Sequence, residues 1–118
     1  ATEQFAAQVS ISARNGTFEF PGCHVGDACY QTIRLTNSSN LPAQFQFPTD
    51  SGSAGAVFDV KPRAGIIPAN DFYLVLLKFR PTAARKYEYG LKCVINHEPD
   101  MAQTVTLIGE GAIPTVKV

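Results

Sequence analysis

The chain has 118 residues, 45 % of them hydrophobic, and its ten basic and ten acidic residues cancel to a formal charge of zero. This length predicts one domain with a single hydrophobic core. The chain lacks the basic excess with which nucleic-acid-binding proteins neutralise phosphates, and no apolar run approaches the roughly 20 residues of a membrane span. We therefore expect no nucleic-acid partner and no membrane insertion.

The three cysteines, Cys23, Cys29 and Cys93, cannot all pair within one chain. Small secreted domains usually carry an even number of cysteines at framework spacings. We interpret the odd count as that of a cytoplasmic protein in a reducing compartment. A Cys23–Cys29 bridge with one free thiol remains the alternative.

Apolar residues recur with a period of two along most of the chain. In residues 31–36, for example, Ile33 and Leu35 alternate with polar neighbours. This period is typical of half-buried strands, and turn signals such as Asn15-Gly16 separate the runs. In chain order we expect strands at residues 9–13, 17–20, 29–36, 43–47, 57–61, 72–80, 87–95 and 104–109. Short strands at this spacing predict an all-β sandwich.

The same alternation predicts which side chains fill the space between the two sheets. Each large apolar side chain that is buried there contributes roughly 1.5–3 kcal/mol to stability. The expected core residues are Ile33, Leu35, Phe45, Phe47, Phe58, Tyr73, Val75, Leu77, Phe79, Tyr87, Tyr89, Leu91, Cys93, Ile95, Val105 and Leu107.

Prolines bracket the longest apolar run, in residues 60–81. Proline lacks a backbone N–H and therefore stands at strand boundaries and edges. We expect Pro62 to close one strand, Pro68 to precede the next, and Pro81 to end it. Gly65 is expected to allow a positive φ in the turn between them.

Several of these segments, in this order and spacing, resemble the major sperm protein and PapD-like group, and within it the ASH domain of Hydin-like ciliary and centrosomal proteins. The resemblance rests on residues 17–20 with Val25-Gly26, on Asn37, on residues 58–62 with 65–68, on residues 79–81 and on residues 107–111. It implies an immunoglobulin-like antiparallel β-sandwich of seven to eight strands. The structural motif positions would be Asn37, Pro62, Gly65, Pro68, Phe79, Pro81 and Gly109.

The resemblance also implies a non-enzymatic scaffolding role at the axoneme, basal body or centrosome, with axonemal or centrosomal proteins as partners. We expect residues 1–111 to form the domain. Residues 112–118, which are again strand-like, are expected to be a linker or the first strand of a following domain. The alternative is a terminal strand that folds back onto this sheet.

No pattern in the sequence indicates a reaction centre. His24 lies beside Cys23, and Cys93 lies four residues before His97, but these spacings match no common zinc site. A Cys–His nucleophile pair would also need an orienting group and an oxyanion site. We therefore expect no catalytic residue, no metal and no cofactor.

The best candidate for an interaction surface lies on the strand at residues 72–80. Leu74 and Leu76 fall on the face opposite its core residues, and Lys78 and Arg80 continue that face. An exposed apolar patch often marks a partner site. The alternative is that the amino end of the chain, with Phe5, covers the two leucines.

Basic residues suggest a second kind of surface, a basic strip that would bind the acidic tails of tubulin. The residues expected to form it are Arg34, Lys78, Arg80, Arg85, Lys86 and Lys92. The alternative is that these charges are merely solvated on their strands.

Two further function classes stay open. A VAP-type adaptor would capture acidic-tract peptides, and Arg34 matches one of its basic positions, but Pro48 and Thr49 stand where lysine is expected. An extracytoplasmic chaperone or adhesion domain would bind partners through a free strand edge. The glycosylation-like triplets at Asn15 and Asn37 would fit that second class, whereas the odd cysteine count argues against it.

Overall fold

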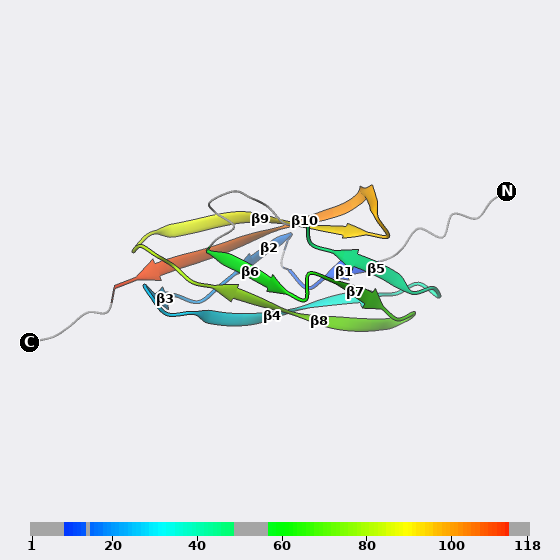
Figure 1. The fold of residues 1–118 in the computed structure, drawn as a ribbon, viewed down its shortest axis with the longest axis horizontal. Helices are drawn as coiled ribbons and strands as arrows, with labels where there is room; N and C mark the ends of the chain where they lie inside the picture. The colour runs from blue at the N-terminus through cyan, green and yellow to red at the C-terminus, as the bar shows by residue number, and fades with distance from the viewer. Residues whose placement is uncertain (1–8, 14, 49–56, 114–118) are drawn as a thin grey trace, which may run out of the picture.

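The computed structural model describes residues 9–13, 15–48 and 57–113 (Figure 1). Within these ranges the chain forms ten strands and no helix, so none of the described segments is a helix that could cross a membrane. The strands are β1 (Val9–Ile11), β2 (Thr17–Glu19), β3 (Cys23–His24), β4 (Cys29–Asn37), β5 (Ala43–Gln46), β6 (Phe58–Lys61), β7 (Ala64–Ile67), β8 (Asp71–Phe79), β9 (Lys86–Ile95) and β10 (Glu98–Ala112). All eight predicted strands are present, with ends shifted by up to six residues, and β3 and β7 are additional.

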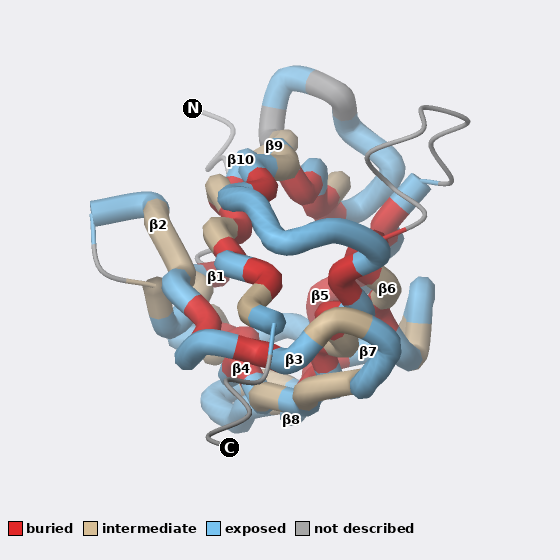
Figure 2. Tube along the Cα trace, turned by 90° about the vertical axis from the view of Figure 1, so that its left-hand side faces the viewer, coloured by how far each residue is buried: buried red, intermediate tan, exposed pale blue. Residues whose placement is uncertain are grey.

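The strands form two sheets that pack face to face. One sheet has the order β1-β4-β8-β6, and the other has the order β2-β10-β9-β5-β7 with β3 also paired to β10. Every pairing is antiparallel except those of β2 and β3 with β10, which are parallel. The buried parts of the chain lie between the two sheets (Figure 2). The predicted fold class, an immunoglobulin-like β-sandwich, is confirmed.

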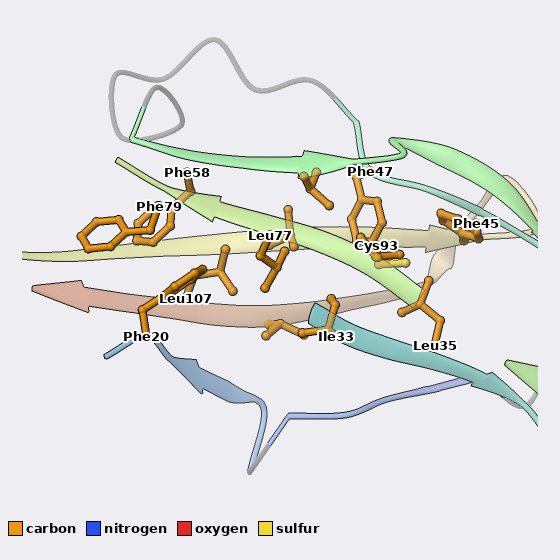
Figure 3. Packing of buried hydrophobic residues seen from close by; sticks show 14 of the residues in the cluster. Phe20, Ile33, Leu35, Phe45, Phe47, Phe58, Leu77, Phe79, Cys93 and Leu107 are labelled. Atoms are coloured by element: carbon orange, nitrogen blue, oxygen red, sulfur yellow. The ribbon is translucent and has the colours of Figure 1, made fainter. Parts of the chain in front are cut away.

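The core consists of the inward side chains of both sheets, as the alternation predicts (Figure 3). On β8, Val75, Leu77 and Phe79 are fully buried. Of the sixteen predicted core residues, only Tyr73 and Tyr89 are partly buried rather than buried. Because successive side chains of a strand point to opposite faces, one β8 residue in two is left for the outer surface.

An aromatic cluster fills one end of the core around Phe79. Its ring stacks on Phe58 with centroids 4.9 Å apart and contacts Phe20 and Tyr87 at 5.5 and 5.8 Å. Gly109 on β10 lies directly against the same ring, because a Cβ atom added there would come within 2.6 Å of it. The glycine is thus needed for the close approach of β10 to the aromatic cluster.

The turn prediction for Gly65 is wrong. Gly65 does not adopt a positive φ in a turn; it lies within β7, where an added Cβ atom would come within 2.8 Å of the Phe45 ring. The turn after β9 is formed by Asn96 and His97, both with positive φ. Two consecutive residues of positive φ make the tight hairpin turn whose twist matches that of the strands, and asparagine tolerates this conformation well.

The end of β10 lies close to the expected domain boundary. Ala112 is the last residue of β10 and pairs with His24 of β3. Ile113 follows and is 69 % exposed. The predicted linker or further strand therefore concerns mainly residues 114–118, which lie outside the described residues.

Candidate interaction surface

An apolar patch covers the outer face of the β4–β8 pair. It consists of Tyr30, Phe72, Leu74 and Leu76, which are 53, 46, 53 and 42 % exposed. Leu74 lies opposite Arg34 across the two strands, and Leu76 lies opposite Thr32. The patch therefore belongs to two adjacent strands in the middle of a sheet.

Basic side chains surround the apolar patch. The guanidinium carbon of Arg34 lies 4.6 Å from the centroid of the Phe72 ring, a cation–π arrangement. Lys78 follows Leu76 on the same face of β8, and Lys61 of β6 lies opposite Leu76. The nearby carboxylate of Asp59 is already engaged by Arg63 at 2.8 Å. The rim of the patch is thus mainly positive.

The structure divides the six basic residues predicted to form a strip between different surfaces. Arg34 and Lys78 lie on the outer face of the sheet that contains β4 and β8, and Arg80 directly follows β8. Arg85 and Lys86 lie at the start of β9, where the Arg85 guanidinium covers the Tyr87 ring at 4.7 Å. Lys92 lies further along β9, in the other sheet.

Leu74 and Leu76 are exposed, so the first condition for a partner surface is met. The alternative that Phe5 covers them falls on a residue outside the described part of the chain. Because surface leucines on neighbouring positions are rare without a reason, the apolar patch remains the best candidate site.

Two hollows lie on the described surface. The larger one, of about 380 Å³, lies over β5 and β7 and is lined by Gln44, Phe45, Gln46, Ala64, Gly65, Ile66 and His97. It contains no pair of titratable side chains. A smaller one between β6 and β9 has room for about one water molecule.

Asn37 is the one polar side chain in the buried part of the described structure. Its amide nitrogen donates to the carbonyl oxygens of Leu41, Ile67 and Pro68 at 2.8, 3.2 and 3.2 Å. Its amide oxygen accepts from the backbone N–H and the hydroxyl of Ser39. The residue therefore ties the end of β4 to the following turn and to the β7–β8 connection. An amide nitrogen engaged in this way is no glycosylation acceptor in the folded domain.

Cys23 and Cys29 form a disulfide, with Cα atoms 6.1 Å apart. The structure thus has the alternative arrangement, one bridge and one free thiol, because β3 places Cys23 beside the first residue of β4. No group of three or more potential metal ligands occurs among the described residues, and His97 stands exposed at the hairpin turn.

The remaining thiol, that of Cys93, is fully buried, and burial raises its pKa from about 9 to about 11. A raised pKa means that the folded state favours the neutral thiol. The contribution of the neutral thiol to the free energy of unfolding is fully present below pH 9 and is lost as the pH rises through 11. The pKa shift alone lowers the fraction of reactive thiolate at pH 8. We therefore expect Cys93 in the native chain to react with iodoacetamide about a hundredfold more slowly than Cys93 in the unfolded chain. Mass spectrometry of timed samples measures the rate. Equal rates in native and denaturing buffer would contradict the burial of this thiol.

Comparison with known proteins decides the family. A family model described as "CFAP65, fourth Ig-like domain" matches residues 17–112. The chain belongs to this family of CFAP65 Ig-like domains. The match spans the chain from the start of β2 to the end of β10, and so includes Asn37, Phe79 and Gly109.

A relative of the CFAP65 family domain is cilia- and flagella-associated protein 65 of Chlamydomonas reinhardtii, 32 % identical over 111 residues. The alignment covers 94 % of this chain but only 5 % of the relative's length. Among solved structures, the ASH/PapD-like domain 7 of human CEP192 matches with a TM-score of 0.72, 20 % identity, and coverage of 98 % of this chain and 92 % of that one. WR4, a C. elegans member of the major sperm protein family, matches with a TM-score of 0.54, 13 % identity, and coverage of 91 and 100 %.

The two structural likenesses, at such low identity, establish the fold alone. Together with the family match, they confirm the predicted resemblance to an ASH-type, PapD-like domain of a ciliary or centrosomal protein. An immunoglobulin-like domain of the CFAP65 family is therefore established.

Proposed function

We propose that the chain is a non-enzymatic module of a much longer cilium- or centrosome-associated protein, and that it binds another protein through the apolar patch of Tyr30, Phe72, Leu74 and Leu76. The observation that carries the proposal is the exposure of four large apolar side chains on one face of a well-packed sheet. A soluble domain gains nothing from such a cluster unless a partner covers it.

The family match supports the proposed parent protein and its cellular location. The chain spans about 5 % of the length of its Chlamydomonas relative, whose name assigns it to cilia and flagella. The description of the family model as a fourth Ig-like domain also implies that other Ig-like domains precede it in CFAP65. Neighbouring domains and axonemal or centrosomal proteins are accordingly the expected partners, at the cilium or centrosome.

The non-enzymatic part of the proposal is supported by the family match to an immunoglobulin-like domain. Acidic tubulin tails are not part of it, because the basic residues lie on two sheets rather than in one strip. Family membership favours this function over a VAP-type adaptor and over an extracytoplasmic chaperone.

The test is a double substitution, Leu74→Lys with Leu76→Lys, in the full-length protein. Because both side chains point outward, we expect the melting temperature of the isolated chain to change by no more than about 3 °C, as for ordinary surface changes. Ciliary localisation of the tagged full-length protein and recovery of its cross-linked neighbours should be lost. Fluorescence microscopy and quantitative mass spectrometry measure these two results.

The matched control is Gln44→Lys with Gln46→Lys. These residues are also exposed, two positions apart on one strand, but they lie in the other sheet. The control should keep both localisation and neighbours. The proposal fails if the leucine variant folds and localises normally, or if both variants behave alike.

A further inference from the structure

The first strands of the second sheet lie beside the last strand and run in the same direction. β2 pairs in parallel with β10 from Thr17↔Thr106 to Glu19↔Ile108, and β3 continues the pairing at Cys23↔Gly111 and His24↔Ala112. Both point toward the pole of the sandwich at which β10 ends, on the left of Figure 1. The first two strands of this sheet are therefore held beside the last described strand, β10.

This arrangement decides how the domain resists tension along the chain. Tension from the amino-terminal side reaches β2 through β1, which pairs with β4 over three residues. Tension from the carboxyl-terminal side pulls β10 toward the pole at which it ends, in the direction opposite to the pull on β2. The hydrogen bonds between parallel strands lie across this direction, so they are sheared together and do not open one after another.

Additional contacts hold the end of β10 on both sides. The N–H of Val25 donates to the Ala112 carbonyl oxygen at 2.8 Å, and the N–H of Gly111 donates to the Arg85 carbonyl oxygen at 2.8 Å. Gly111 has no side chain, and the Ala83 carbonyl occupies the place where one would be. The Tyr87 hydroxyl fixes this turn by accepting the Ala83 N–H at 2.9 Å.

The disulfide joins the same region to the other sheet. Cys23 belongs to β3 and Cys29 begins β4, so the bridge covalently connects a strand paired with β10 to a central strand of the first sheet. Force on β3 is thereby shared with β4, which pairs with β8 over nine residues.

We propose that the domain bears mechanical tension between its neighbours, and that β2, β3 and the end of β10 form a tension clamp that resists it. This inference shares one assumption with the proposed function, namely that the polypeptide continues on both sides of the domain. It does not depend on the apolar patch or on a ciliary partner.

The first test compares two directions of pulling on the same chain in single-molecule force spectroscopy. In one, the chain is held by its two ends. In the other, it is held through side-chain handles at Asn15 and Thr104, which are both exposed and lie at the same end of the β2–β10 pair. Because the second direction opens the bonds one at a time, we expect it to need a several-fold lower force at the same loading rate. Equal unfolding forces in both directions would overturn the proposal.

The second test removes one bond of the tension clamp. Val25→Pro lacks the N–H that donates to Ala112, and the preceding His24 is already extended, as a residue before proline prefers. At constant end-to-end force we expect Val25→Pro to unfold roughly fivefold faster, the effect of one backbone hydrogen bond. Val25→Ala, which keeps the N–H, is the matched control and should resemble the unaltered chain.

The handles at Asn15 and Thr104 separate a clamp effect from a general loss of stability. When the chain is pulled through these two handles, the hydrogen bond from the Val25 N–H to Ala112 is the last to break. The Val25→Pro variant should then unfold at the same rate as the unaltered chain. An equal acceleration in both directions would show general destabilisation and reject the clamp. The Leu74→Lys, Leu76→Lys variant should keep its end-to-end unfolding force whether or not it loses its partner, so the two proposals fail independently.

Discussion

Replacing Gly109 with valine is expected to lower the free energy of unfolding by about 3 kcal/mol, at the upper end of the usual cost of overpacking a core. An added Cβ atom would lie 2.6 Å from the Phe79 ring, which is fully buried and stacked on Phe58. The ring cannot move away without disturbing its contacts with Phe20 and Tyr87. For a domain of this size the change corresponds to a fall of about 10 °C in melting temperature.

The matched control for this change is Gly90→Val. Gly90 lies on β9, the strand paired with β10, but it is exposed, and an added Cβ atom would meet only a Thr104 methyl group at 3.4 Å. Valine also favours strands, so we expect a change within about 0.5 kcal/mol. Urea unfolding followed by fluorescence compares the two variants. If both variants were equally stable, β10 would not approach the aromatic cluster as closely as the structure shows.

Replacing Asn37 with alanine is expected to cost about 3 kcal/mol, because it removes the hydrogen-bond partner of one buried and several partly buried polar groups. The carbonyl oxygens of Leu41, Ile67 and Pro68 would each lose a donor, and the Ser39 N–H would lose its acceptor. Asn37 is fully buried, so water cannot easily replace these bonds. The expected loss is comparable to that of Gly109→Val, although its cause is polar.

Asn40→Ala serves as the control, since Asn40 lies in the same turn but is exposed. Its amide oxygen accepts only one described side-chain bond, from Asn70 at 3.1 Å. We expect a loss within about 0.5 kcal/mol. Thermal unfolding by circular dichroism measures both variants. An Asn37→Ala variant as stable as Asn40→Ala would mean that the network around Asn37 contributes little.

Alternation alone predicts most of this fold. The pattern of β8 assigns Val75, Leu77 and Phe79 to the core and Leu74 and Leu76 to the outside, and the structure agrees. Such patterns are reliable because a strand has only two faces, and a shift of one residue would exchange them. The family resemblance succeeded for a related reason, since its segments are the strand ends and turns that the sandwich needs.

The features that the sequence could not reveal depend on contacts between distant segments. Gly65, for example, resembles a turn glycine until the ring of Phe45, twenty residues away in the sequence, is placed over it. Asn37 was found as a motif position, but its role follows from carbonyl groups thirty residues away. Local patterns contain no information about such neighbours.

The candidate site was predicted in part. The exposure of Leu74 and Leu76 follows from the strand pattern, whereas the contributions of Tyr30 and Phe72 to the same patch require the β4–β8 register. The basic strip illustrates the opposite case. Lys92 and Arg34 are separated because their strands belong to different sheets, and nothing in the spacing of charges along a chain predicts the sheet to which each strand belongs.

The position of β10 between β2 and β9 also determines when the domain can fold during its synthesis. β10 is the last described strand to leave the ribosome, yet it separates two strands made before it and supplies Val105 and Leu107 to the core. Until it emerges, β2 has no strand partner among the described residues and the aromatic cluster is open on one side. Nearly the whole domain must therefore leave the ribosome before the sandwich can close, and until then its apolar side chains stay exposed to aggregation.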